Sequence, residues 1–212
     1  MEGKLKIKVC GMRDPSNLEA VCTLHPDYIG YIFFRDSPRY VGDKPDKALF
    51  TIPANSMTRV GVFVNEKLDV VRKISHSGIL DMVQLHGDES PEYCRSLASE
   101  GILVIKSADA ARHDSGIMRS YLGAASLFLF DTPDRSRGGT GRKFEWDLLH
   151  GYRLPVPYLL SGGIGPGDAG AIMKMDRRWL HGVDVNSRFE VSPGVKETGM
   201  LEQFINEIRN QG

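Results

Sequence analysis

The sequence lacks an excess of charge of either sign. Lys and Arg together number 27, as do Asp and Glu, so the formal net charge at pH 7 is +0 with His neutral. Proteins that bind nucleic acid or an anionic membrane through their overall field need a surplus of positive charge. The composition therefore argues against both kinds of partner, and an anionic ligand must be held by a local site.

Cysteine is scarce, and long apolar stretches are absent. Cys10, Cys22 and Cys94 are an odd number at wide spacing, which fits neither a disulfide framework nor a zinc site. Residues 1–9 contain no apolar stretch long enough for a secretory signal. A run of about 18 apolar residues, the minimum for a membrane span, is also missing. We expect a reduced, cytoplasmic protein with no metal site.

The chain does contain short β-branched or apolar segments at fairly even intervals. Each is about as long as a buried strand, and most are continuously apolar, which is typical of parallel strands covered on both faces. The predicted strands are 5–9, 28–33, 59–64, 81–85, 102–105, 126–130, 157–160 and 182–185.

The segments between these strands have helical character. Asp14-Pro15 and Ser90-Pro91 each offer an N-cap followed by proline at the first helical position. Apolar residues at helical spacing predict further helices over 66–77, 167–175 and Thr198–Asn210. Such alternation predicts parallel strands joined by crossovers, in either an open doubly wound sheet or a closed barrel.

Polar and glycine residues of functional type follow the C-terminal ends of the predicted strands. In order they are Cys10-Gly11, Ser37-Pro38-Arg39, Asn65, His86-Gly87-Asp88, Lys106, Asp131-Thr132, Ser161-Gly162-Gly163-Ile164 and Asn186-Ser187. In a barrel these ends converge on one face, where active sites of that fold lie, whereas an open sheet spreads them along an edge. The sequence therefore predicts an α/β fold: a single-domain (β/α)8 TIM barrel with parallel strands over residues 1–212.

Small residues near the last strands favour a phosphate site. Gly162 and Gly163 form a turn between strand and helix, where backbone N–H groups can approach an anion closely. Asn186 and Ser187 stand where barrels often complete a phosphate cradle. Gly139, in the glycine-rich segment 138–141, is a further candidate donor. The alternative for the first two sites is an ordinary tight turn, and the alternative for segment 138–141 is a solvated loop.

Cys10 and Asp131 are the candidate proton-transfer groups. Most free cysteines are small buried hydrophobes, but Cys10 stands at a strand end, where a modest downward shift of its pKa would make it a base. Asp131 ends an apolar run, and partial desolvation there favours the protonated, acid-competent form. Capping of the following turn is the alternative for Asp131.

Three more side chains are candidates for substrate contacts. The guanidinium of Arg39 suits a carboxylate or phosphate, with a surface ion pair as the alternative. His86 is either a ligand-facing imidazole or a hydrogen-bonded structural one. Asp184 either orients the ligand or pairs internally with a lysine or arginine.

A series of longer motifs runs along almost the whole chain. They are Lys8-Val9-Cys10-Gly11-Met12, Gly30-Tyr31-Ile32-Phe33-Phe34 with Ser37-Pro38-Arg39, Val60-Gly61-Val62-Phe63-Val64-Asn65, Val83-Gln84-Leu85-His86-Gly87-Asp88-Glu89, Leu129-Phe130-Asp131-Thr132, Gly138-Gly139-Thr140-Gly141, Leu160-Ser161-Gly162-Gly163-Ile164, Val183-Asp184-Val185-Asn186-Ser187, and Glu190 with Ser192-Pro193-Gly194-Val195-Lys196. Each motif is modest alone, but their order and spacing are specific. Together they resemble the phosphoribosylanthranilate isomerase family.

The resemblance implies a cofactor-free barrel that isomerises N-(5′-phosphoribosyl)anthranilate, a phosphosugar, in tryptophan synthesis. It implies that Asp131 is the general acid that opens the ribose ring and that Cys10 is the general base that removes the proton on carbon 2. It places Arg39 near the anthranilate carboxylate and Asp184 on the substrate side. Gly162, Gly163 and Ser187 match the family's phosphate-loop positions.

One position departs from the family's pattern, because Arg188 stands where the family usually has glycine after Asn-Ser. If the position needs a positive φ, arginine is disfavoured there. If the loop faces the phosphate, the guanidinium strengthens anion binding. Both interpretations stay open at this point.

Two other functions compete with this one. Another phosphosugar barrel enzyme would show a lysine–glutamate acid–base set or a metal site of histidines and aspartates, whereas His86 stands nearly alone. A non-catalytic binder of phosphate ligands would not need both Cys10 and Asp131. The quaternary state, monomer or homodimer, is left open.

Overall fold

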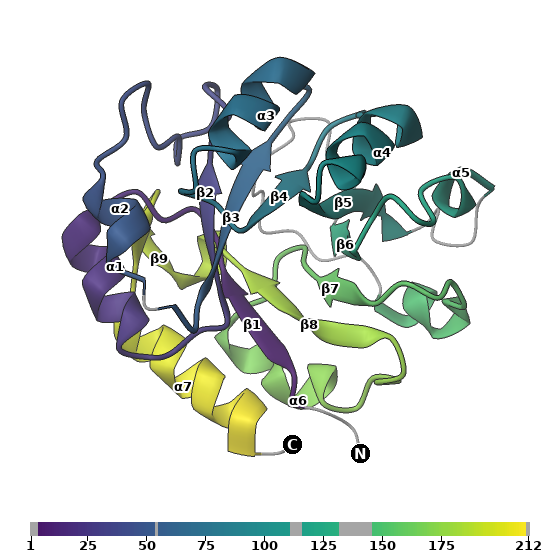
Figure 1. Ribbon diagram of the computed structural model, residues 1–212. Helices are drawn as coiled ribbons and strands as arrows, with labels where there is room; N and C mark the ends of the chain where they lie inside the picture. The colour runs from purple at the N-terminus through teal and green to yellow at the C-terminus, as the bar shows by residue number, and fades with distance from the viewer. Residues whose placement is uncertain (1–3, 54, 111–115, 132–145, 211–212) are drawn as a thin grey trace.

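The structure, a computed structural model, describes residues 4–53, 55–110, 116–131 and 146–210. Eight parallel strands form a closed barrel in the order β1 to β8, with β8 returning to β1 (Figure 1). Their bounds are β1 Lys6–Val9, β2 Tyr28–Ile32, β3 Thr58–Phe63, β4 Met82–Leu85, β5 Leu103–Asp109, β6 Leu127–Asp131, β7 Tyr158–Leu160 and β8 Leu180–Val185. Lys8 pairs with Tyr28 on one side and with Asp184 on the other. The predicted TIM barrel is confirmed, and the open sheet is excluded.

The predicted strands are all present, with differences at their ends. The largest is in β5, which runs four residues past the predicted end at Ile105. Pairing with β6 continues from Ile105 opposite Leu127 to Asp109 opposite Asp131, and this ladder keeps the polar residues extended. Lys106 was predicted to follow the fifth strand, and this is wrong because Lys106 lies within it.

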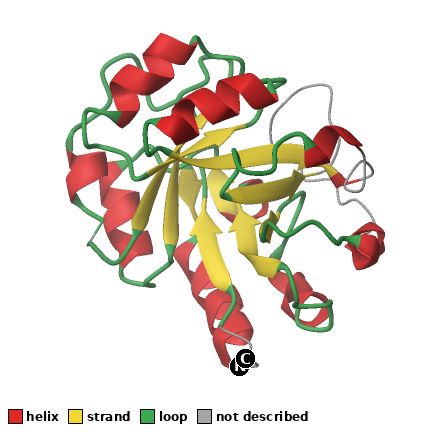
Figure 2. Ribbon diagram, turned by 45° about the vertical axis from the view of Figure 1, so that its right-hand side comes forward, coloured by secondary structure: helices red, strands yellow, loops and turns green. Residues whose placement is uncertain are grey.

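Helices and short 3-10 turns cover the outside of the barrel (Figure 2). Their bounds are α1 Pro15–Cys22, α2 Ala48–Thr51, α3 Leu68–Ser75, α4 Pro91–Ser99, α5 Gly116–Arg119, η2 Trp146–Gly151, η3 Pro166–Asp168, α6 Ala169–Ile172, η4 Ser187–Phe189 and α7 Thr198–Asn210. A small antiparallel pair, β9 Glu190–Ser192 and β10 Val195–Lys196, follows β8. Among the described helices, none is long and apolar enough to cross a membrane.

The local signals for helix starts are confirmed. Asp14 Oδ1 accepts a hydrogen bond from Asn17 N at 2.7 Å, and Ser90 Oγ accepts one from Tyr93 N at 3.2 Å. Such caps satisfy backbone donors that the first helical turn leaves unpaired. The helix predicted over 167–175 is shorter than expected, because the chain forms η3 before α6.

Alternation along each strand sorts side chains between the barrel interior and the helices. Along β6, Leu127 and Leu129 belong to a small apolar cluster with Val60, Met82, Ile105 and Leu159. Phe128 and Phe130 pack in the large outer core. Asp131, two residues beyond Leu129, shares the interior side at the C-terminal end of the strand. The interior is thus apolar in its middle and polar at the face where the strands end.

Candidate active site

Cys10 directly follows β1 and is buried, with 4% of the residue exposed. The backbone of β2 passes close to it: a Cβ atom added to Gly30 would lie 2.7 Å from Cys10 Sγ and 3.0 Å from its Cα. Any larger residue at position 30 would displace the thiol. Glycine in β2 therefore creates the space that Cys10 occupies.

A buried ion pair lies beside this thiol. Lys8 Nζ donates to Asp184 Oδ1 at 3.0 Å, and both residues are buried where β1 pairs with β8. Burial raises the pKa of Asp184, although Lys8 opposes this. The charge of Asp184 also acts on Cys10, and Asp184 is itself influenced by Asp131 and His86. The internal pairing considered for Asp184 is confirmed, with Lys8 as its partner.

The pKa of the Cys10 thiol is raised, chiefly by burial, which disfavours the charged thiolate. Lys8 and, more weakly, Lys196 act in the opposite direction, whereas Asp184 adds to the rise. This direction is opposite to the modest downward shift of pKa that would make Cys10 a usable base. Position at a strand end did not expose the thiol, because neighbouring strands close around it.

Asp131 ends β6 with its side chain 28% exposed, and His86 faces it. His86 Nε2 lies 3.5 Å from Asp131 Oδ2, and Gln84 Nε2 lies 3.0 Å from His86 Nδ1. Burial chiefly, together with the charge of Lys106, lowers the pKa of His86 to about 4. The imidazole is therefore neutral near pH 7. With the Gln84 amide nitrogen as donor, Nδ1 is the acceptor, and the neutral imidazole then carries its proton on Nε2.

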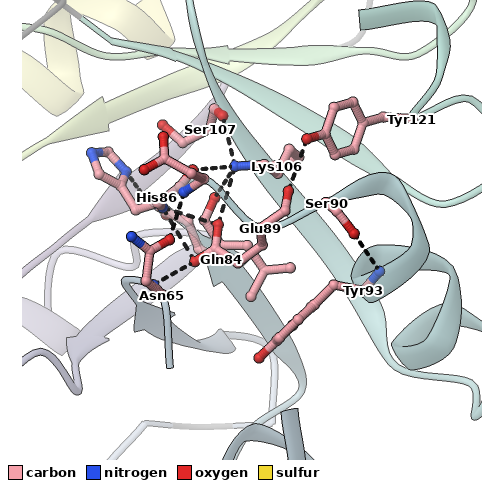
Figure 3. Close-up of polar contacts among 12 residues, drawn as sticks. Asn65, Gln84, His86, Glu89, Ser90, Tyr93, Lys106, Ser107 and Tyr121 are labelled. Atoms are coloured by element: carbon pink, nitrogen blue, oxygen red, sulfur yellow. Dashed lines mark hydrogen bonds and ion pairs between the residues drawn. The ribbon is translucent and has the colours of Figure 1, made fainter. Parts of the chain in front are cut away.

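The turn that carries His86 is held by a buried lysine (Figure 3). Lys106 Nζ donates to Gly87 O at 2.7 Å and to the carbonyl oxygens of Leu85 and Ser107 at 3.2 Å. It also contacts Glu89 Oε2 at 3.2 Å. These bonds tie the end of β4 to β5, so His86 is held in a fixed place.

Glu89 completes this connection on the other side. Its carboxylate accepts hydrogen bonds from Asn65 N at 2.8 Å and from Gly87 N at 3.0 Å, which joins the end of β3 to the turn (Figure 3). Sequence reasoning missed this role of Glu89. The available signal was an acidic residue shortly after one strand together with a lysine inside the next.

Arg39 forms an ion pair within the protein. Its Nε donates to Glu190 Oε1 at 2.9 Å and its Nη2 to Glu190 Oε2 at 2.7 Å. Both side chains are buried, so the pair is not the surface pair considered above. Lys196 Nζ contacts Glu190 Oε1 at 2.6 Å. Although burial raises the pKa of Glu190, hydrogen bonds and the charges of Arg39 and Lys196 hold it below its usual range.

The candidate phosphate residues lie after β7 and β8. Gly162 and Gly163 have φ values of 86° and 69°, so both adopt a left-handed conformation that favours glycine. Ser187 begins η4, and the side-chain oxygen of Asn186 accepts a hydrogen bond from Lys196 Nζ at 2.8 Å. Gly139 and the rest of 138–141 lie outside the described residues, as does Thr132.

Arg188 adopts an ordinary backbone conformation in η4. His25 and Asn65 are the only non-glycine residues with positive φ within the described ranges. The explanation by backbone strain at Arg188 is therefore excluded. A Cβ atom added to Gly165 would lie 3.2 Å from Arg188 Cδ, so the arginine stem lies beside the segment that follows Gly162 and Gly163.

Comparison with known proteins gives the same result as the motifs. Residues 7–207 match the family described as N-(5′phosphoribosyl)anthranilate (PRA) isomerase. The chain belongs to this family. An N-(5′-phosphoribosyl)anthranilate isomerase of Parabacteroides distasonis is 41% identical over 204 residues, which cover 95% of this chain and 92% of that one.

Solved structures of phosphoribosylanthranilate isomerases have the same fold. The enzyme of Thermotoga maritima superposes with a TM-score of 0.83 at 29% identity, over 97% of this chain and 99% of that one. Another isomerase structure, in complex with reduced 1-(o-carboxyphenylamino)-1-deoxyribulose 5-phosphate, gives a TM-score of 0.78 at 28% identity over the same shares. The family result supports the isomerase interpretation and neither of its two competitors.

Proposed function

We propose that the chain converts N-(5′-phosphoribosyl)anthranilate to 1-(o-carboxyphenylamino)-1-deoxyribulose 5-phosphate, an aldose-to-ketose isomerisation in tryptophan biosynthesis. Membership of the isomerase family supports the reaction class. The single observation that carries the assignment of residues is the position of Cys10 and Asp131. Cys10 directly follows β1 and Asp131 ends β6 of one closed barrel, and strand alternation puts both on its interior side.

Asp131 acts as the general acid in this proposal. Its carboxyl proton passes to the ribose ring oxygen as the bond from that oxygen to carbon 1 breaks. The lone pair of the anthranilate nitrogen forms the iminium, and the ring opens. His86, neutral and with its Nε2 3.5 Å from Asp131 Oδ2, is the proposed neighbour that orients the carboxyl group.

Cys10 acts as the general base. Its thiolate takes the proton from carbon 2, and the electron pair of that C–H bond forms the double bond between carbons 1 and 2. The iminium nitrogen is thereby neutralised, and the resulting enolamine tautomerises to the ketone. The two groups must have opposite protonation states at the same pH, which separate environments at two strand ends can provide.

The ends of the substrate are held by different groups. Backbone N–H groups at Gly162, Gly163 and Ser187 are the proposed donors to the phosphate, with Gly139 and Asn186 as further candidates. The stem of Arg188 lies beside Gly165, shortly after Gly162 and Gly163, and its guanidinium is a further proposed contact for the phosphate.

At the other end, Arg39 is the proposed partner of the anthranilate carboxylate. The bidentate pair with Glu190 occupies two guanidinium nitrogens and leaves Nη1 as the donor for a ligand. Asp184, paired with Lys8, is a further proposed substrate contact from β8. This arrangement supports a planar, bidentate residue at position 39 rather than a simple point charge.

The remaining properties are also proposals. The whole chain, 1–212, is one catalytic barrel domain that needs no cofactor or metal. It works in the cytoplasm as a monomer or homodimer, and its partner is the phosphosugar substrate. Turnover that survives prolonged dialysis against a chelator supports the absence of a metal requirement, and loss that added metal restores contradicts it.

The reaction is tested by following anthranilate-type fluorescence after purified protein is mixed with freshly made phosphoribosylanthranilate. Rapid loss with the wild type and not with Asp131→Asn supports both the reaction and the acid. If neither protein changes the fluorescence, the substrate is misassigned, and other phosphosugars become the candidates.

A further inference from the structure

Lys8 is a charged side chain that the steps above do not use. It is fully buried, with 0% of the residue exposed, inside the barrel near its catalytic face. Burying an ammonium group is strongly unfavourable unless its surroundings compensate for the lost water. An apolar side chain would fill this position without that cost. The lysine therefore needs an explanation besides packing.

Two groups compensate for the buried charge. Lys8 Nζ donates to Asp184 Oδ1 at 3.0 Å, and Cys10 also favours the charged form of the ammonium group. Burial by itself lowers the pKa of Lys8, but Asp184 and Cys10 together raise it above the ordinary value. Lys8 therefore keeps its proton and is a permanent cation.

Strand geometry produces this arrangement. Lys8 and Cys10 are two residues apart, so their side chains lie on the same side of the extended chain. Ile7 and Val9 lie on the opposite side and belong to the outer core. The register places Asp184 directly opposite Lys8 on β8. The cation therefore contacts the anion across the strand pair and lies on the same side of its own chain as the thiol.

We propose that Lys8 is a positioning residue for the base: its ammonium, anchored by Asp184, stabilises the Cys10 thiolate that removes the proton from carbon 2. This inference rests on the proposed function, because it assigns a purpose to the thiolate. Lys8 itself transfers no proton. When Cys10 takes the proton, the sulfur becomes neutral, and the ammonium remains paired with Asp184.

The charges around the thiol act in opposing directions. Lys8 from β1 and Lys196 from β10 favour the thiolate, whereas Asp184 from β8 disfavours it. From β2 the neighbour is Gly30, which has no side chain. The positive charge of Lys196 is offset by Glu190 at 2.6 Å. Of the two lysines, Lys8 therefore does more to offset the unfavourable burial of the thiolate.

The opposite effects of Lys8 and Asp184 on the pKa of Cys10 distinguish an electrostatic role of Lys8 from a purely structural one. Removing either member of a merely structural ion pair disturbs the site in a similar way. If Lys8 stabilises the thiolate, Lys8→Met raises the pKa of Cys10, whereas Asp184→Asn lowers it. The two substitutions thus break the same ion pair but shift the pKa of the Cys10 thiol in opposite directions.

The experiment measures thiolate absorbance in the ultraviolet against pH, without substrate, in full-length protein carrying Cys22→Ser and Cys94→Ala. Cys10 is then the only thiol, since the chain has 3 cysteines. Lys6→Met is the matched control. Lys6 is also on β1 and is paired with Asp27, but its side chain is 46% exposed. It is four residues from Cys10, about 13 Å along a strand.

The expected order of thiol pKa is Asp184→Asn lowest, wild type and Lys6→Met equal, and Lys8→Met highest. Lys8→Met should also lower kcat roughly tenfold or more near neutral pH, with recovery as the pH rises. If Lys8→Met is unstable, Lys8→Met with Asp184→Leu replaces the whole pair by apolar groups. The thiol pKa of this double variant should still be higher than that of the wild type.

Two results overturn the proposal. One is a thiol pKa in Lys8→Met, or in the double variant, no higher than in the wild type. The other is a shift of the same sign in Lys8→Met and Asp184→Asn. If either result is obtained while wild-type turnover persists, the proposed function stands and only the role of Lys8 is lost. If the order holds but phosphoribosylanthranilate is not consumed, the substrate assignment fails instead.

Discussion

His86 Nε2 lies 3.5 Å from Asp131 Oδ2, so a neutral imidazole faces the carboxyl group at the end of β6. The two residues come from different strands, and the bonds of Lys106 and Glu89 hold the turn behind His86. A catalytic acid needs both a suitable protonation state and a fixed direction. In the acid role proposed for Asp131, the neighbouring His86 supplies the direction.

Asp131→Asn is expected to lower kcat by roughly a hundredfold to ten-thousandfold, because it removes a proton donor and keeps the shape of the side chain. The fluorescence assay measures the rate, and circular dichroism checks the fold. Asp147→Asn, on η2 with its side chain 91% exposed, is the matched control and should retain full activity. Near-normal turnover in Asp131→Asn would remove Asp131 from the mechanism.

Cys10→Ser is expected to cause a loss of similar size, because a hydroxyl group is a far weaker base than a thiol near neutral pH. Its substrate affinity, measured by titration with a product analogue, should change little. Cys22→Ser, at the end of α1, should leave both quantities unaltered. Turnover by Cys10→Ser within a fewfold of the wild type would show that another group removes the proton.

Comparing Arg39→Ala with Glu190→Gln distinguishes the contribution of this buried ion pair to substrate binding from its contribution to the stability of the fold. Breaking a buried ion pair typically costs about 3–5 kcal/mol, so both variants should unfold at lower urea concentration. Only Arg39→Ala should greatly raise KM, because Glu190→Gln keeps the guanidinium. An equal KM in the two variants would argue against contact between Arg39 and the substrate carboxylate.

The stability of the fold should depend on His86 in acid. Its pKa is about 4 in the folded chain and 6.5 in the reference state, so the unfolded chain binds the proton more readily. Stability is therefore complete above about pH 6.5 and falls as the pH drops toward 4. At about 1.4 kcal/mol per pKa unit, the loss amounts to about 3 kcal/mol.

Urea unfolding at about pH 7 and about pH 4.5 measures this loss. His86→Gln, which cannot be protonated, should show a smaller difference between the two conditions than the wild type. His150→Gln, whose side chain is 59% exposed, serves as the control and should behave like the wild type. The same pH dependence in His86→Gln and in the wild type would assign the acid sensitivity to other groups.

Arg188→Ala should raise KM severalfold with little change in kcat, because the arginine contributes charge rather than chemistry. The effect should shrink at high salt, which screens exposed charges. Arg95→Ala, an exposed arginine on α4, is the control. Equal KM values for Arg188→Ala and the wild type at low salt would exclude a phosphate contact.

Much of the fold follows from local patterns. Eight apolar segments, the caps at Asp14 and Ser90, and polar residues after each strand were sufficient to predict the barrel and the face that carries the site. These signals are local because alternation and capping depend on neighbouring residues. The end of β5 was missed because its pairing with β6, not its own sequence, keeps residues 106–109 extended.

The sequence by itself determined the fold, the family and the candidate acid and base. Only the tertiary structure decided how each charge is partnered. Lys8 and Asp184 are 176 residues apart in the chain, and Arg39 and Glu190 are 151 apart. No local pattern joins such residues. Closure of the barrel pairs β8 with β1, and a charge buried there is tolerated only when an opposite charge lies beside it.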